Sequence, residues 1–234
     1  MNCLLEAAIE ARVPFSAITL KGAGEGAPLW TGEGVSLVSD HGFPDFTDES
    51  KALLTGGPEP VLSFIGGTKH VQLGLLRQMD DPSEPPFDFV LPEAPRLPLE
   101  SGTEVIPFDG VRQLIRREFK RRLRLIAKVA SLAPGRLIQF GPPPPVSDRW
   151  LEPFLLKQNV SATALPNRLL RWKLWRVTMA LFQEHAVECG ARFVDCPPEA
   201  LDADGFMRDD LVRNVTHGNV EFGRLLLAQV QAQS

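Results

Sequence analysis

The sequence predicts an α/β fold, a three-layer α/β/α sandwich in which a mostly parallel sheet lies between two layers of helices. Three short apolar runs that do not alternate with polar residues predict buried strands, at 61–65, 137–140 and 192–194. Two longer segments, 111–130 and 167–189, carry apolar residues at helical spacing. Strands and helices that alternate along a chain are typical of a parallel sheet with helices on both faces.

Length and composition indicate a single globular domain over residues 1–234. This length suffices for a full core, and 44 % apolar with 23 % charged residues is ordinary for such a domain. The net charge of −4 gives no overall positive field that would attract nucleic acid. No apolar stretch approaches the length of a membrane span, and the first residues do not resemble a signal peptide. We therefore expect neither nucleic acid nor a membrane as a partner.

Cysteine and histidine usage argues against disulfides, metals and cofactors. The three cysteines have no CxxC spacing, which favours free thiols in a cytoplasmic protein: Cys3, Cys189 and Cys196. The four histidines include no pair at i, i+4 spacing, so no metal site on a helix is expected. The glycines at 22, 24 and 26 lack the Gly-Lys-Ser/Thr ending of a phosphate-binding loop. We expect no metal and no cofactor.

The N-terminal third is predicted to combine a helix, a strand and a Gly-rich loop. Apolar residues recur at helical spacing over 2–11, which predicts the opening helix. A short apolar run at 15–20 predicts a strand, and the glycines of 21–34 predict a loop. Two short helical patches are expected at 49–54 and 70–79.

In the second half of the chain, prolines and glycines mark the boundaries. The Pro-rich, polar segment 81–107 is predicted to be a long connection within the domain. The helix at 111–130 has one apolar stripe and ends before Pro134-Gly135. A loop over 196–218 leads into the last helix, at 220–230.

The loop before the last helix offers a candidate general base, His217. A histidine titrates near neutral pH and therefore suits proton transfer. Asn214, three residues earlier, can bind the Nδ1 atom of this histidine and fix its tautomer. The alternative is that this stretch is only the start of the last helix, with Asn219 as its N-cap and an incidental histidine.

Two Gly-containing turns follow predicted strands and are candidate binding elements. Gly66-Gly67-Thr68 comes directly after the run at 61–65, and backbone N–H groups in such a turn can form an oxyanion hole. The alternative is a tight turn between a strand and a helix. Gly141 and the prolines 142–145 also follow a strand, at the end where open α/β sheets bind ligands. The alternative for that segment is a rigid connector, or an extended segment that docks a partner.

The helix at 111–130 also carries a strongly basic face. Its cations are Arg112, Arg116, Arg117, Lys120, Arg121, Arg122, Arg124 and Lys128. Such a face is able to bind an anionic glycan or nucleic acid. The favoured interpretation is a solvated helix surface, because the net charge is negative and no aromatic residues interleave for base stacking.

Taken in order along the chain, these turns resemble the sequence blocks of the SGNH (GDSL-like) hydrolases. The Gly-Gly turn resembles the block that helps to form the oxyanion hole, and Asn214-Val-Thr-His217 resembles the block that usually reads Asp-x-x-His. The resemblance implies an ester hydrolase with a covalent acyl-serine, in which His217 is the base, Asn214 orients it, and Gly67 and Thr68 are oxyanion donors. The residues beside these turns are assigned to substrate binding: His70, Pro142 and Asn219.

The sequence departs from the family pattern at three points. The opening strand and the Gly-Asp-Ser turn are absent, since Met1 stands where the first helix begins; we expect them upstream in a longer protein, or lost from the gene. Thr68 replaces the usual Asn. Asn214 replaces the usual Asp, which predicts a steep fall in activity because Asn stabilises an imidazolium poorly. Neither Cys3, expected to face the core, nor Ser63, within a strand, suits the role of nucleophile.

Three kinds of function are compatible with these features. The first is a hydrolase of small-molecule or glycan esters, such as O-acylated sugars, that is active when the serine is present. The second is a non-catalytic SGNH-like domain that binds a glycan or a protein. The third is a subunit that pairs through a sheet edge left exposed by the missing strand, in the simplest case a homo-oligomer.

Overall fold

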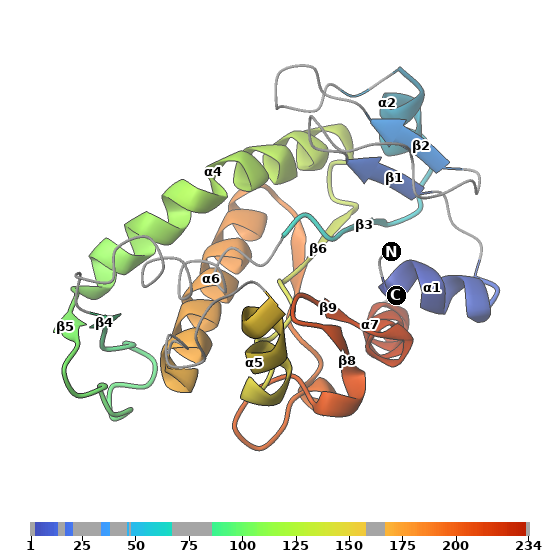
Figure 1. Ribbon diagram of the computed structural model, residues 1–234. Coiled ribbons are helices and arrows are strands. Elements are labelled where there is room, and N and C mark those ends of the chain that lie inside the picture. Colours follow the sequence, from blue (N-terminus) through green and yellow to red (C-terminus); the bar gives the residue numbers. More distant parts are fainter. Residues whose placement is uncertain are drawn as a thin grey trace.

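A three-stranded parallel sheet is the main sheet of the structure (Figure 1). The computed structural model describes residues 3–13, 17–20, 34–37, 46, 48–66, 86–157 and 167–232. The strand order is β3-β6-β7, with bounds Val61–Ser63, Leu137–Phe140 and Arg192–Val194. In the central strand β6, Leu137 pairs with Val61 and Ile138 pairs with Arg192. The mixed α/β character and the parallel strands are as predicted, although β3 ends two residues earlier than expected.

Two long helices, α4 (Phe108–Leu132) and α6 (Arg168–Glu188), pack against each other (Figure 1). The apolar stripe of α4 is buried, and Ile115 and Phe119 are fully covered. The ring of Phe119 meets that of Phe182 edge-on, with 5.2 Å between the centroids. Both helices were predicted. The apolar residues whose spacing predicted α4 form the face of the helix that packs in the core.

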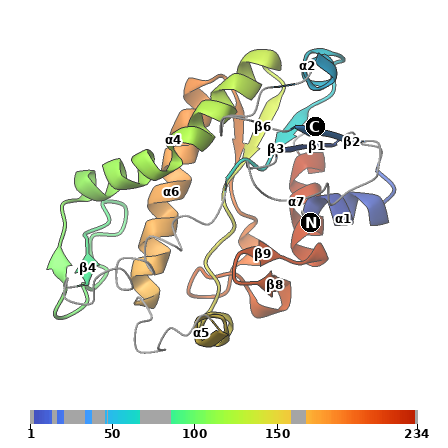
Figure 2. The same cartoon turned by 45° about the horizontal axis from the view of Figure 1, so that its top comes forward.

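A second pair of helices, α1 (Cys3–Glu10) and α7 (Val220–Ala232), joins the two ends of the chain. The two lie side by side in both views of the molecule (Figure 1, Figure 2). They approach closely at Gly223, where a β-carbon would overlap the backbone carbonyl group of Cys3. A residue without a side chain is therefore needed at position 223 for the two backbones to touch.

The side chains of β6 enter two different buried clusters. All four residues of the strand are buried. Leu137 belongs to the cluster that contains the α4 and α6 side chains, whereas Ile138 and Phe140 belong to a cluster with residues of α1 and α7. Successive side chains of a strand point to opposite faces of a sheet. Both faces of β6 are therefore packed against helices.

Smaller elements surround this core. Besides two short 3₁₀ helices, Pro198–Ala200 and Asp209–Leu211, the described residues form three two-stranded sheets and two further α-helices. The sheets are β1 (Ala17–Leu20) with β2 (Gly34–Leu37), β4 (Phe87–Asp88) with β5 (Glu104–Val105), and β8 (Val212–Asn214) with β9 (His217–Gly218); the helices are α2 (Asp48–Thr55) and α5 (Asp148–Lys157). Only the β8–β9 pair is antiparallel among these sheets.

The segment 86–107 lies within the predicted Pro-rich connection 81–107 and includes the short strands β4 and β5. A buried ion pair fastens it to α6: Nζ of Lys173 lies 2.9 and 3.0 Å from the two carboxylate oxygens of Asp88. The two side chains are 0 % and 2 % exposed. The same ammonium group donates to the carbonyl of Pro98 at 3.2 Å. Partners so distant in sequence leave no local pattern, so composition alone could not indicate this attachment to α6.

Further elements were not predicted. The β8–β9 hairpin and the two short 3₁₀ helices, Pro198–Ala200 and Asp209–Leu211, lie within 196–218, which was expected to be a loop. Helix α5 contains Pro153, a residue that argues against a helix interior, and β2 lies in a mixed segment with turn residues. The short helix expected at 70–79 lies outside the described residues. None of the helices in the described part of the chain combines the length and apolar character needed to cross a membrane.

Candidate functional site

The predicted base, His217, lies on a tight antiparallel hairpin formed by β8 and β9. Asn214, at the end of β8, pairs with His217 at the start of β9, and Val215-Thr216 forms the turn between them. The hairpin therefore places the side chains of positions 214 and 217 next to each other. Asn214 and His217, whose spacing of three residues suggested a contact, are thus direct partners across the two strands of the hairpin.

The amide oxygen of Asn214 fixes the tautomer of His217. This oxygen accepts the backbone N–H of Thr216 at 3.0 Å; an N–H can only donate, so the atom that faces it must be Oδ1. The same Oδ1 lies 3.0 Å from Nδ1 of His217. Because this oxygen only accepts, Nδ1 must carry the proton, and Nε2 keeps a free lone pair. The Thr216 hydroxyl lies 2.8 Å from Nδ1 and donates its own proton to Asn214 at 3.0 Å.

The Nε2 atom of His217 is available as a proton acceptor. It has no hydrogen-bond partner within the described part of the chain, and the side chain is exposed. Partial burial of the ring lowers the pKa of His217 from its ordinary value of 6.5, and nearby positive charges, including Arg213, lower this pKa further. The imidazole is therefore neutral at neutral pH, which is the state that a general base requires.

The hairpin is held against the first helix. Arg213 in β8 donates to the carboxylate of Glu6 in α1 at 2.8 Å. On the other side, the backbone N–H of Asn219 donates to the carbonyl of Leu211 at 2.8 Å. Together with the close approach of Gly223 to the backbone of Cys3, these contacts place the His217 hairpin beside the first turn of α1.

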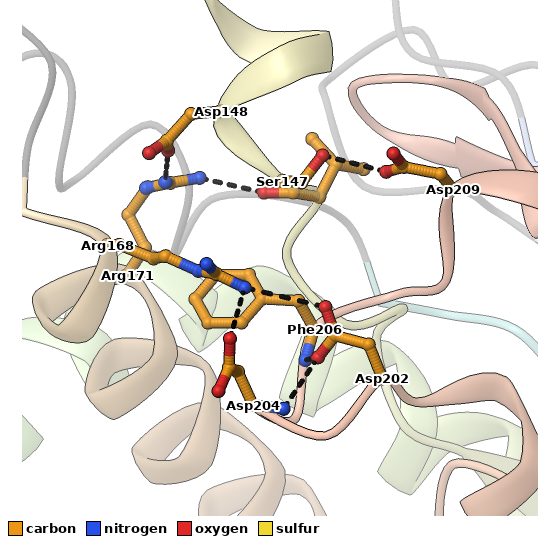
Figure 3. A network of polar contacts seen from close by, with 9 residues as sticks. Ser147, Asp148, Arg168, Arg171, Asp202, Asp204, Phe206 and Asp209 are labelled. Atoms are coloured by element: carbon orange, nitrogen blue, oxygen red, sulfur yellow. Dashed lines mark hydrogen bonds and ion pairs between the residues drawn. The ribbon is translucent and has the colours of Figure 1, made fainter.

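The hairpin is also connected to the segment that leaves β6 at its carboxyl end. The backbone N–H of Met207 donates to the carbonyl of Pro145 at 3.0 Å. The hydroxyl of Ser147 donates to the carboxylate of Asp209, just before β8, at 2.7 Å (Figure 3). The proline run therefore acts as a rigid connector that carries the chain from the sheet to the base of the hairpin.

Two stacked arginines support the same connector from α6 (Figure 3). The guanidinium carbons of Arg168 and Arg171 lie 4.3 and 5.6 Å from the ring centroid of Phe206. Arg171 is buried, donates to the carbonyl of Val146 at 2.8 Å and forms an ion pair with Asp148 at the start of α5. The guanidinium groups of these two arginines are therefore engaged within the protein, and they stabilise the segment that follows β6 and contacts the hairpin.

A closed hydrogen-bond circuit shapes the turn after β3. The Ser63 hydroxyl donates to Oε1 of Gln139 at 2.6 Å and accepts the N–H of Ile65 at 3.3 Å. The amide nitrogen of Gln139 donates to the carbonyl of Ile65 at 3.1 Å. Both polar side chains are buried, and together they satisfy the backbone groups of Ile65 just beyond the end of the β3 ladder. Sequence analysis missed this circuit; the signal was one polar residue inside each of two apolar runs.

This circuit leads directly into the candidate oxyanion turn. A β-carbon on Gly66 would lie 3.9 Å from the α-carbon of Pro142, so the segments that follow β3 and β6 meet at one edge of the sheet. Gly67, Thr68 and His70, the other residues assigned here from the sequence, lie outside the described residues.

Two residues assigned to substrate binding are engaged within the protein. Pro142 is buried, and its carbonyl accepts a hydrogen bond from the indole of Trp175 at 3.1 Å. The side chain of Asn219 accepts the N–H of Phe222 at 3.2 Å and donates to the carbonyl of Asp210 at 2.7 Å. Asn219 is thus the N-cap of α7, which is the alternative that the sequence left open for this residue.

None of the three cysteines, which all lie in the described part of the chain, forms a disulfide. Cys3 is half-buried against the core cluster of α1 and α7, as expected, and burial raises the pKa of its thiol to about 11. Burial also raises the pKa values of the thiols of Cys189 and Cys196. None of the three is therefore an activated thiolate at neutral pH.

Cys189 and His185 lie close together but do not form a nucleophile–base pair. Nε2 of His185 is 3.6 Å from the sulfur and 2.7 Å from the carbonyl oxygen of Leu123. A carbonyl only accepts, so Nε2 carries a proton and has no lone pair for the thiol. His217 is thus the histidine whose free nitrogen suits catalysis in the described structure.

Comparisons with known proteins add no family assignment. No protein-family model matches the chain, and no curated protein matches it. Within the described residues, no group of three or more His, Cys, Asp or Glu side chains is arranged to hold a metal ion.

Proposed function

We propose that this chain is the SGNH-like domain of an ester hydrolase, with His217 as the general base and Asn214 as the residue that orients it. The observation that carries the proposal is the contact between Oδ1 of Asn214 and Nδ1 of His217, which leaves Nε2 unprotonated and, among the described residues, without a hydrogen-bond partner. This is the arrangement in which a histidine removes a proton from a hydroxyl nucleophile. The scaffold in this proposal is a three-layer α/β/α sandwich around β3-β6-β7.

The position of the hairpin supports the proposal. Arg213 ties the hairpin to Glu6 in α1, and Gly223 allows the backbones of α7 and α1 to touch. A nucleophile held at the first turn of α1 would therefore lie on the same side of the sheet as His217. The turn after β3 approaches Pro142 at the carboxyl edge of the strands, where open α/β sheets bind ligands.

The chemistry follows from these positions. Nε2 of His217 accepts the proton of a serine hydroxyl while the serine oxygen attacks the ester carbonyl, and the alcohol leaves with that proton. Water then attacks the acyl-serine with the same base, and the carboxylic acid is released. The N–H groups of Gly67 and Thr68 are the proposed donors to the oxyanion. The substrate class is a small-molecule or glycan ester, and the nucleophile in this proposal is the serine of a Gly-Asp-Ser turn, which a form extended at its N-terminus would have to carry.

The test uses such an extended form and p-nitrophenyl acetate. We expect turnover that falls about a thousandfold or more in His217→Gln, because the base is lost. An exposed arginine between β4 and β5, changed as Arg96→Gln, is the matched control and should retain activity. Full turnover in His217→Gln, or no turnover in the extended form, would show that the assignment is wrong.

A second candidate is a non-catalytic SGNH-like domain that binds a glycan or a protein. The neutral amide of Asn214 favours it, since Asn cannot stabilise a charged imidazolium as a carboxylate does. A glycan-binding screen with the 234-residue chain tests this function without any turnover. Binding that disappears in His217→Ala, with the circular dichroism spectrum unchanged, would support it, and binding that is insensitive to this substitution would place the ligand elsewhere.

A further inference from the structure

Five cations form a continuous row on the solvent face of α4, and we call this row the basic stripe. It consists of Arg116, Arg117, Lys120, Arg121 and Arg124, all exposed. The spacing of three and four residues puts them on one face of the helix over successive turns. At 1.5 Å per residue, positions 116 to 124 span about 12 Å.

The basic stripe lies opposite the packed face of α4. The buried residues of this helix include Ile115, Phe119, Leu123 and Ile126, which face the core cluster. The helix is therefore held by its apolar side and does not use the cations for packing. Their presence calls for another reason, especially in a chain whose net charge is −4.

The charges of the basic stripe are almost uncompensated. Only Arg117 has a carboxylate within 4 Å, that of Glu118 at 3.9 Å; the other four have none among the described residues. Other surface arginines of this chain behave differently, because each forms an ion pair with an acidic side chain: Arg112, Arg176, Arg208, Arg213 and Arg224. The absence of acidic neighbours thus distinguishes the basic stripe from the surfaces around these five arginines.

Uncompensated cations at this spacing destabilise a helix. Like charges three and four residues apart on a helix repel each other. In the basic stripe, this repulsion acts between Arg116 and Lys120 and between Arg117 and Arg121. The same repulsion acts next to the stripe: burial lowers the pKa of Arg122, and the charge of Arg121 lowers it further. A ligand that brings several negative charges along the helix would relieve this repulsion.

We propose that the basic stripe binds an anionic polysaccharide. Four of its five cations are arginines, whose planar guanidinium groups bind carboxylates in pairs of parallel hydrogen bonds. A polymer with one carboxylate per sugar presents its charges in a row, which matches cations that recur once per helical turn. The inference does not depend on His217 or on ester hydrolysis, so each can fail without the other.

Two observations favour a polysaccharide over a nucleic acid. Among the described residues, no large aromatic side chain is exposed on α4, so unpaired bases have no surface on which to stack. The net negative charge of the chain also opposes a polymer as densely charged as DNA or RNA, whereas a glycan with one charge per sugar meets less repulsion.

The test measures binding of the full chain to fluorescein-labelled polygalacturonate by fluorescence anisotropy over a range of salt concentrations. We expect binding that weakens as salt increases, and no binding to neutral dextran. The variant Arg116→Gln/Lys120→Gln/Arg124→Gln should lose about tenfold or more in affinity, because three ionic contacts are removed. Gln is a good helix former, and circular dichroism verifies that the helix persists.

The matched control removes three cations elsewhere, as Arg149→Gln/Arg208→Gln/Arg224→Gln. It changes the net charge by the same amount and should alter the affinity by less than about threefold. An equal loss in both triple variants would overturn the proposal, because binding would then depend on net charge alone. Tighter binding to single-stranded DNA of equal charge would assign the stripe to nucleic acid instead, and no binding to polygalacturonate at low salt would also overturn it.

Discussion

Gly223 in α7 rests directly on the backbone of Cys3 in α1. A β-carbon at position 223 would overlap the carbonyl group of Cys3 and would lie 2.9 Å from the amide nitrogen of Leu4. Backbone atoms cannot move aside as a flexible side chain can, so this contact sets the distance between the first and last helices. It also sets the position of the His217 hairpin, which lies just before α7 and is tied to α1 by Arg213.

The substitution Gly223→Ala should therefore separate α1 from α7. We expect a loss of about 1–3 kcal/mol in the free energy of unfolding, the usual cost of forcing extra atoms into a packed contact. Urea denaturation measures it. Gly110→Ala in α4 is the matched control: its β-carbon would lie 3.5 Å from Cγ2 of Ile106, an ordinary contact, and should leave stability unchanged or slightly higher. Equal effects of the two substitutions would contradict this account of the helix contact.

The tautomer of His217 can be observed directly. At pH 8 we expect the nitrogen-15 chemical shifts of the ring to show a protonated Nδ1 and an unprotonated Nε2, because Asn214 accepts a hydrogen bond from Nδ1. Asn214→Ala should remove this preference. Asn214→Asp should instead raise the pKa of His217, since a carboxylate next to Nδ1 favours the imidazolium. A mixture of tautomers in the unsubstituted protein would remove the main support for a general base.

The lowered pKa of His217 also predicts how stability depends on pH. In the folded state this pKa lies below its ordinary value of 6.5, so the unfolded chain binds the proton more readily in this range. The contribution of His217 to stability is therefore present above pH 6.5 and is lost as the pH falls below it. Urea denaturation at pH 5 and pH 8 measures the free energy of unfolding of the unsubstituted protein and of His217→Gln. Relative to His217→Gln, the unsubstituted protein should be more stable at pH 8 than at pH 5. A stability difference that is the same at both pH values would argue against a lowered pKa.

The circuit between Ser63 and Gln139 should make a large contribution to the edge of the sheet. Gln139→Leu removes a partner of the buried Ser63 hydroxyl and of the partly buried Ile65 carbonyl. We expect a loss of about 1–3 kcal/mol, the cost of buried groups left without hydrogen bonds. In a double-mutant cycle, Ser63→Ala/Gln139→Leu should cost less than the sum of the single variants. Strict additivity would mean that the two residues act independently.

The buried pair of Lys173 and Asp88 should hold the Pro-rich segment on α6. Lys173→Met leaves the carboxylate of Asp88 buried without its cation, which we expect to cost about 3–5 kcal/mol. Lys173→Met/Asp88→Asn should recover part of this loss because no net charge remains buried. Hydrogen exchange of residues 86–107 reports the local effect. Unchanged protection of this segment in Lys173→Met would show that other contacts hold it.

The elements that the sequence predicted well are those with a strong local pattern. Helix α4 has an apolar stripe over many turns, and β6 is a short apolar run bounded by Pro134-Gly135 and Gly141. Helix α5 escaped prediction because Pro153 breaks the local pattern, although the helix starts where Asp148 meets Arg171 of α6. Contacts of that kind are invisible to any window of neighbouring residues.

In the candidate site too, some features could be predicted from local sequence and others could not. The residue types and the spacing of Asn214 and His217 were enough to predict that one would orient the other, because three residues of chain keep them within reach. The amino acid sequence also indicated the parallel arrangement, since mostly apolar, non-alternating strands separated by helices are typical of a parallel sheet covered on both faces. Only the tertiary structure decided that the proline run is a buried connector, that Asn219 is a helix cap, and that Ser63 and Gln139 shape the turn after β3. The physical reason is that each of these depends on a hydrogen bond or a contact whose partner is fixed by the packing of the surrounding elements and not by local spacing alone.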